Sequence, residues 1–144
     1  AQGCKAGSLA FRVPMGDRSS GNPQEIKDKV CVAVRVRPLS LKEHREGGTG
    51  IIETSGSQLL SLSREKQGPL NYAFDHVFAP ETSQSQVFRD LGLPLLDRAF
   101  EGYNCTIFAY GQTGSGKTHT MLNHKAGDDR GVVPRFSEEL FSRI

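Results

Sequence analysis

The residues that could carry chemistry are concentrated in one glycine-rich segment, Gly111-Gln112-Thr113-Gly114-Ser115-Gly116-Lys117-Thr118. The segment matches the pattern GxxxxGK[ST] at every fixed position. Glycines let the backbone adopt positive φ and turn its N–H groups inward, so that they can hold an anion. The spacing predicts that Lys117 reaches the β- and γ-phosphates of a nucleotide and that the Thr118 hydroxyl binds Mg²⁺.

The pattern is specific enough to make a chance match improbable. Glycine makes up about 7% of an average protein, so the four fixed positions match at roughly one start in 30,000. An apolar run precedes the segment, and a helix can begin at Lys117. The alternative, a glycine-rich turn with a solvated lysine, is therefore disfavoured. The pattern by itself does not distinguish small-molecule kinases, GTPases, ATPases and motors.

Two runs of apolar and β-branched residues predict the strands that position this loop. Residues 30–36 are typical of a strand covered on both faces, and residues 105–110 predict a second apolar, β-branched and aromatic strand. Pro38 ends the first, because proline cannot donate to a ladder. Residues 51–54 and 58–63 predict a hairpin around Gly56, and the alternating aromatics of 72–78 predict a further strand.

Helices are predicted between and after these strands. Thr82 is a suitable N-cap for a helix over about 83–100, which Pro94 should kink or divide into two pieces and Gly102 should stop. Another helix should follow Lys117, and Pro134 can open a last helix that continues to Ile144. A strand, a helical crossover and a strand–glycine turn–helix unit imply an α/β fold with a largely parallel or mixed sheet.

Composition excludes several other classes. The net charge of +2 is too small to argue for a nucleic-acid partner. No apolar run approaches the ~20 residues of a membrane span, and no secretion signal is recognisable. Three widely spaced cysteines fit neither a disulfide framework nor a zinc site. Residues 1–29 mix Gly, Ser, Pro and scattered charge, which predicts a disordered leader.

The chain from about Val30 to Ile144 resembles the motor domain of kinesins. The segment YNCTIFAY running into GQTGSGKT and then HTM is similar to that family's hallmark. Three further segments agree in order and spacing: Val34–Pro38 (VRVRP), Phe74–Phe78 (FDHVF) and Gly131–Arg135 (GVVPR). The resemblance is specific because four motifs recur in the same order.

The resemblance implies a fold, a site and a partner. The fold is a P-loop NTPase-type three-layer sandwich with a central mixed sheet, here incomplete. Arg35 and Pro38 would flank the adenine of ATP, with His119 packing on its other side. Gly111–Thr118 would hold the phosphates, with Lys117 on the β/γ pair and Thr118 on Mg²⁺. Without the family, Arg35 would be read as a solvated charge at a strand end and His119 as an ordinary first-turn residue.

Two segments that kinesins use to orient water and sense the γ-phosphate, NxxSSR and DxxGSE, do not occur in the 144 residues. We therefore expect 30–144 to be the N-terminal part of a cytoplasmic, cytoskeletal microtubule motor. The parent would contact the microtubule through downstream regions and be a microtubule-stimulated ATPase, whereas this part alone would be inactive and poorly stable. The alternatives are a truncated non-motor product that binds nucleotide without hydrolysis, and a different phosphate-loop enzyme.

Overall fold

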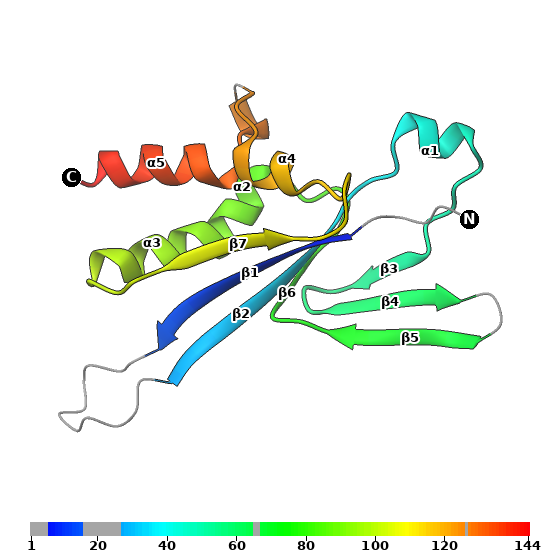
Figure 1. The fold of residues 1–144 in the computed structure, drawn as a ribbon, viewed down its shortest axis with the longest axis horizontal. Coiled ribbons are helices and arrows are strands. Elements are labelled where there is room, and N and C mark those ends of the chain that lie inside the picture. The colour runs from blue at the N-terminus through cyan, green and yellow to red at the C-terminus, as the bar shows by residue number, and fades with distance from the viewer. Residues whose placement is uncertain (1–5, 16–26, 65–66, 126) are drawn as a thin grey trace.

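The computed structural model describes residues 6–15, 27–64, 67–125 and 127–144, and its main feature is a four-stranded sheet (Figure 1). The strands β1 (Ala6–Met15), β2 (Lys27–Val36), β6 (His76–Phe78) and β7 (Thr106–Tyr110) lie in the order β6-β2-β1-β7. β2 and β6 are parallel, whereas β1 runs antiparallel to both β2 and β7. The sheet is therefore mixed, and the predicted α/β class is confirmed.

The predicted leader is wrong where the structure can be compared with it. Residues 6–15 form β1, and β2 begins at Lys27 instead of residue 30. β1 pairs with β2 along ten residues and with β7 along five. Its hydrogen bonds thus come from strands on both sides, which a local composition argument cannot detect. The rest of the predicted leader, residues 1–5 and 16–26, lies outside the described residues.

A second, antiparallel sheet follows, formed by β3 (Ile52–Ser55), β4 (Leu59–Arg64) and β5 (Gln67–Ala73). The hairpin predicted around Gly56 is confirmed, and Gly56 has a φ of +64°. The single strand predicted over 72–78 is wrong, because β5 and β6 belong to different sheets. The chain crosses between them at Asp75, whose N–H donates to Val32 O and whose carboxylate accepts from Val32 N at 2.9 Å.

The crossover between β6 and β7 is helical but irregular. It consists of α2 (Gln84–Val87), the π-helical turn η1 (Phe88–Gly92) and α3 (Leu93–Phe100). Ser83, not the predicted Thr82, is the N-cap, and its side chain accepts from the N–H of Gln86. Pro94 lies in the first turn of α3, where its missing N–H is tolerated. The regular helix is interrupted just before it by the π-helical turn η1. Gly102, with a φ of +90°, follows the end of α3 as predicted.

The remaining helices are α1 (Leu41–Arg45), α4 (Lys117–Leu122), the 3₁₀ turn η2 (Gly127–Asp129) and α5 (Val132–Ser142). The last helix starts two residues before Pro134 and ends at Ser142, not at Ile144. Figure 1 shows α2 to α5 gathered on one side of the four-stranded sheet. In the described part of the chain, none of these helices is long and apolar enough to cross a bilayer.

Two apolar clusters hold the layers together. One lies between the sheet and the helices and includes Ala33, Phe78, Val87, Leu91 and Leu95. The other lies on the opposite face of β2 and β6, where Val34, Val36 and Val77 pack against Leu60 of the small sheet. Both faces of β2 are therefore covered over residues 33–36, as predicted from its apolar run, whereas Val30 is 53% exposed.

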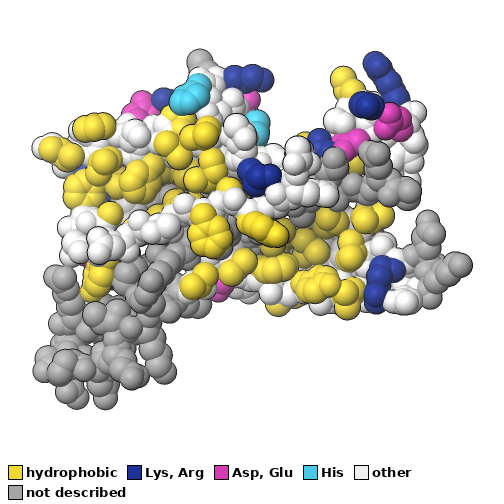
Figure 2. All heavy atoms as spheres, viewed as in Figure 1, with side chains coloured by type: hydrophobic (Ala, Val, Ile, Leu, Met, Phe, Trp, Pro, Cys, Tyr) yellow, Lys and Arg dark blue, Asp and Glu magenta, His cyan; other side chains and the backbone are white. Residues whose placement is uncertain are grey.

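The outer face of β7 is open. Its side chains alternate between half-buried and exposed, and Phe108 and Tyr110 are 54% and 74% exposed. Figure 2 shows hydrophobic side chains at the surface in the middle of that view, below the helices. β7 is also the end strand of its sheet. Its inner face, with Ile107 and Ala109, packs against the core.

Candidate functional site

The glycine-rich segment connects β7 to α4 as a tight loop. Gly111, Gly114 and Gly116 have φ values of +147°, +80° and +95°, a region that side chains with a Cβ rarely adopt. Gly116 is the N-cap of α4. The Lys117 ammonium folds back over the loop and donates to the carbonyls of Gly111 and Gln112 at 2.7 and 3.0 Å. The loop therefore has the backbone conformation and the cation expected of an anion-binding turn.

A cavity of about 650 Å³ opens beside this loop. In Figure 2 the surface is hollowed between the helices and α1. The lining comes from the end of β2 and the residues after it, the turn before α2, the start of α4, and η2: Arg35, Arg37, Pro38, Leu39, Ser40, Pro80, Thr82, Ser83, Gln84, Ser115, Gly116, His119, Thr120, Asp128 and Asp129. Its volume is within the range of small-molecule sites.

The structure brings five of the sequence-predicted residues onto this cavity: Arg35, Pro38, Ser115, Gly116 and His119. The loop residues Gly111, Gln112, Thr113 and Gly114, together with Lys117 and Thr118, do not line it, and Thr118 is exposed. Arg35, Pro38 and His119 thus lie on one cavity together with the last part of the loop.

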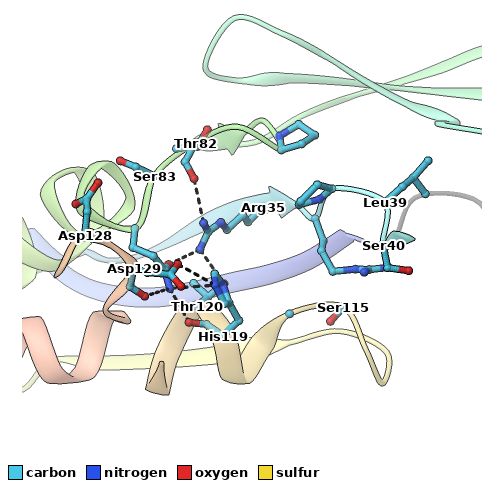
Figure 3. A pocket seen from close by; sticks show the side chains of 15 residues that line it. Arg35, Leu39, Ser40, Thr82, Ser83, Ser115, His119, Thr120, Asp128 and Asp129 are labelled. Atoms are coloured by element: carbon cyan, nitrogen blue, oxygen red, sulfur yellow. Dashed lines mark hydrogen bonds and ion pairs between the residues drawn. The ribbon is translucent and has the colours of Figure 1, made fainter. Parts of the chain in front are cut away.

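The Arg35 guanidinium is hydrogen-bonded within the protein and is not a solvated charge. Its guanidinium donates to Gln84 Oε1 at 2.5 Å, to Thr120 Oγ1 at 3.1 Å and to the carbonyl of Thr82 at 3.0 Å. Figure 3 shows it pointing between the turn before α2 and the start of α4. Burial lowers the pKa of Arg35, and the charge of Asp129 opposes that effect. The arginine therefore joins β2, α2 and α4 beneath the cavity.

His119 is held from the side of η2. Its Nε2 lies 3.2 Å from Asp129 Oδ1, and both side chains are about half exposed (Figure 3). The carbonyl of Asp129 accepts from Asn123 Nδ2 at 2.7 Å, which anchors the turn. Asp128, the neighbouring acid, pairs at 3.1 Å with Arg135 of α5. Asp128 and Asp129 both contribute to the cavity wall.

A third set of contacts fixes the loop after β2. Arg37 Nη2 lies 2.6 Å from each carboxylate oxygen of Glu43. Glu43 also accepts from the N–H of Ser40 at 2.7 Å, and the Ser40 hydroxyl accepts from the N–H of Glu43, forming a capping box at the start of α1. These bonds, that of Arg37 first, lower the pKa of Glu43 from 4.5 to about 2.

Sequence reasoning missed several of these side chains. Ser40 and Glu43 could have been found, because S-x-x-E is a capping-box signature. Gln84, Thr120 and Asp129 carried no recognisable signal. Their importance arises only because the fold brings η2, α2 and α4 together around the end of β2.

The family profile and the individual relatives that match this chain indicate the same family. The family profile of the kinesin motor domain matches residues 35–144. The chain is 44% identical over 125 residues to the kinesin-like protein KIF1A of Rattus norvegicus, covering 80% of this chain and 7% of that protein. It is 41% identical over 123 residues to the kinesin-like protein KIF14 of Mus musculus, covering 81% of this chain and 7% of that protein.

A solved structure is similar as well. It is described as KIF14[391-755] with ADP in complex with a microtubule, and it superposes with a TM-score of 0.67 at 36% identity. The superposition covers 78% of this chain and 32% of that one, so this chain spans only part of the matched domain. With the family profile matching 110 residues that include the loop and the cavity, the chain belongs to the kinesin motor domain family.

Proposed function

We propose that this chain binds Mg²⁺-ATP, with the phosphates at the loop Gly111–Thr118 and the base in the adjoining cavity. The observation that carries the proposal is the continuity of the two features. Ser115 and Gly116 belong to the loop and also line the cavity, which reaches Pro38 and His119. A nucleotide needs such an arrangement, with an anion-binding turn at one end and a less polar recess at the other.

The residues of the loop suit a phosphate chain. Three positive-φ glycines orient backbone amides for an anion. Ser115 Oγ is buried and makes no hydrogen bond within the described part of the chain, which is costly unless a ligand supplies a partner. Lys117 rests on two backbone carbonyls and could exchange them for phosphate oxygens. These observations support the assignment of the loop to phosphates.

The donor set also suits magnesium. Among the described residues, no group of three His, Cys, Asp or Glu side chains could hold a metal ion. Mg²⁺ prefers few protein ligands together with phosphate oxygens and waters. The exposed hydroxyl of Thr118, beside Lys117, is the protein ligand that we assign to it. The bound ion would neutralise charge on the phosphates.

At the base end, the wall is formed by Pro38, the side chain of Arg35 and the His119 ring. An imidazole ring and a proline offer surfaces on which a purine can stack. Because the guanidinium of Arg35 already has three acceptors, we assign its contribution mainly to holding this wall together. This is a narrower role than the direct base contact that the resemblance implied.

For the parent protein we propose an ATP-dependent microtubule motor of the cytoplasmic cytoskeleton, in which residues 30–144 form the N-terminal part of the motor domain. The support is the family membership and the microtubule complex of the similar structure. The second candidate is a nucleotide-binding product without motor activity. The absence of NxxSSR and DxxGSE from the 144 residues favours it for this chain in isolation.

The test is calorimetric binding of Mg²⁺-ATP to the full chain and to Lys117→Ala. Removing a cation that makes charge-assisted bonds with phosphates should weaken binding by about ten- to a hundredfold. Lys42→Ala is the matched control, because Lys42 lies on α1 and its side chain is 83% exposed. Unchanged affinity in Lys117→Ala would overturn the phosphate-loop assignment.

A further inference from the structure

We infer that Gln84 is the positioning residue of the base end of this cavity: it fixes the place and the tautomer of the His119 ring. The inference deepens the proposed function and rests on it for its nucleotide readout. Gln84 is only 3% exposed, although glutamine is mostly a surface residue. It lines the cavity from α2, between β2 on one side and α4 and η2 on the other.

Each end of the Gln84 amide has partners that can only donate or only accept a hydrogen bond. The oxygen accepts from Arg35 Nη1, and a guanidinium can only donate. The nitrogen donates to the carbonyl of His119 at 2.7 Å and to the carbonyl of Asp129 at 3.3 Å. The orientation of the amide is therefore unambiguous. One side chain ties the strand to the backbones of the helix and of the turn.

The same amide determines the state of the imidazole. Gln84 Nε2 lies 3.5 Å from His119 Nδ1, and because this nitrogen can only donate, the contact favours an unprotonated Nδ1. At the other edge of the ring, Asp129 Oδ1 can only accept, so Nε2 must carry the proton. Both neighbours thus favour the Nε2–H tautomer. Gln84 also holds the backbone of Asp129, so it acts on both edges of the ring.

Glutamine meets these requirements and glutamate does not. In Gln84→Glu, one carboxylate oxygen can still accept from Arg35, but the other would face the carbonyls of His119 and Asp129 and repel them. This variant therefore separates the two halves of the contact. Gln86→Glu is the matched control, since Gln86 lies on the same helix, bonds Asp90 and Arg89, and does not line the cavity.

The experiment measures binding of Mg²⁺-ATP and of inorganic tripolyphosphate to the full chain, to Gln84→Glu and to Gln86→Glu. Loss of the contacts that place His119 should weaken ATP binding about tenfold, while tripolyphosphate, which has no base, should bind unchanged. Gln86→Glu should behave as the original chain does. Equal loss for both ligands, or no loss for ATP, would overturn the inference.

A second readout needs no nucleotide. Imidazole ¹H–¹⁵N spectra of the full chain should show His119 as the Nε2–H tautomer. Gln84→Glu should shift it toward a mixture of tautomers, whereas Gln86→Glu should not. An unchanged His119 signal in folded Gln84→Glu would contradict the positioning role. If no form binds ATP, the proposed function fails, and the imidazole spectra still decide this inference. Should Gln84→Glu not fold, Gln84→Met, which also lacks the donor, replaces it in both measurements.

Discussion

Replacing Arg35 by leucine should destabilise the chain strongly, because the guanidinium braces three elements and is not a free strand-end charge. It donates to Gln84, Thr120 and the carbonyl of Thr82, and Gln84 and Thr120 are buried. At about 1 kcal/mol net for each hydrogen bond, Arg35→Leu should lower the free energy of unfolding by about 3 kcal/mol. That is a large fraction of the stability of an ordinary domain.

Urea denaturation followed by circular dichroism measures this loss. With an m-value of about 2 kcal/mol per molar, typical of this chain length, the midpoint should fall by about 1.5 M. Arg89→Leu is the matched control, because Arg89 is exposed and its side chain bonds only Gln86 among the described residues. That variant should change the free energy of unfolding by no more than about 0.5 kcal/mol.

A double-mutant cycle measures how much of this stability loss comes from the hydrogen bond between Arg35 and Gln84. Arg35→Leu and Gln84→Leu remove the two partners of one hydrogen bond, so their combined effect should fall short of the sum by about 1 kcal/mol. A bracing role for Arg35 would be wrong if Arg35→Leu shifted the midpoint no more than Arg89→Leu while still weakening ATP binding. Arg35 would then contact the base without bracing the fold.

Three further predictions concern the capping box, the loop and catalysis. In Glu43→Gln, stability should fall at neutral pH. The stability difference from the original chain should disappear as the pH falls from 4.5 toward 2. The reason is that the Glu43 pKa is lowered to about 2, so that its stabilising charge is lost over that pH range. Denaturation at a series of pH values measures the free energy of unfolding of both forms. Gly116→Ala should lower the free energy of unfolding by about 1–2 kcal/mol because Gly116 has a φ of +95°, although a Cβ there would meet nothing closer than 3.9 Å. Thermal denaturation measures this loss, and the control Gly68→Ala, where φ is not positive, should show none. The purified chain should show no microtubule-stimulated phosphate release, because NxxSSR and DxxGSE are absent from it; a stimulated rate that disappears in Lys117→Ala would contradict this expectation.

Local signals in the sequence predicted the parts of the fold whose structure is decided locally. Gly56 marked the hairpin of β3 and β4, and Gly102 marked the end of α3. Pro94 predicted an interruption, although not its form as a π-helical turn. Gly111, Gly114 and Gly116 have the positive φ that the sequence predicted, because glycine lacks a Cβ and adopts this region at little cost.

Errors arose where tertiary pairing decides the structure. Residues 6–15 became a strand because β2 and β7 pair with them on both sides. Residues 72–78 separated into two strands because Asp75 bonds Val32 across to the other sheet. At the candidate site, Gln84 has no motif of its own. Its role depends on Arg35, His119 and Asp129, which lie up to 49 positions away along the chain.

A crystal structure of the chain with Mg²⁺ and a non-hydrolysable ATP analogue would show where the nucleotide binds. We expect the triphosphate at Gly111–Thr118, with Lys117 moved from the loop carbonyls to the phosphates, and the base in the cavity against Pro38 and His119. A nucleotide bound elsewhere, or an empty cavity at saturating analogue concentration, would contradict this placement.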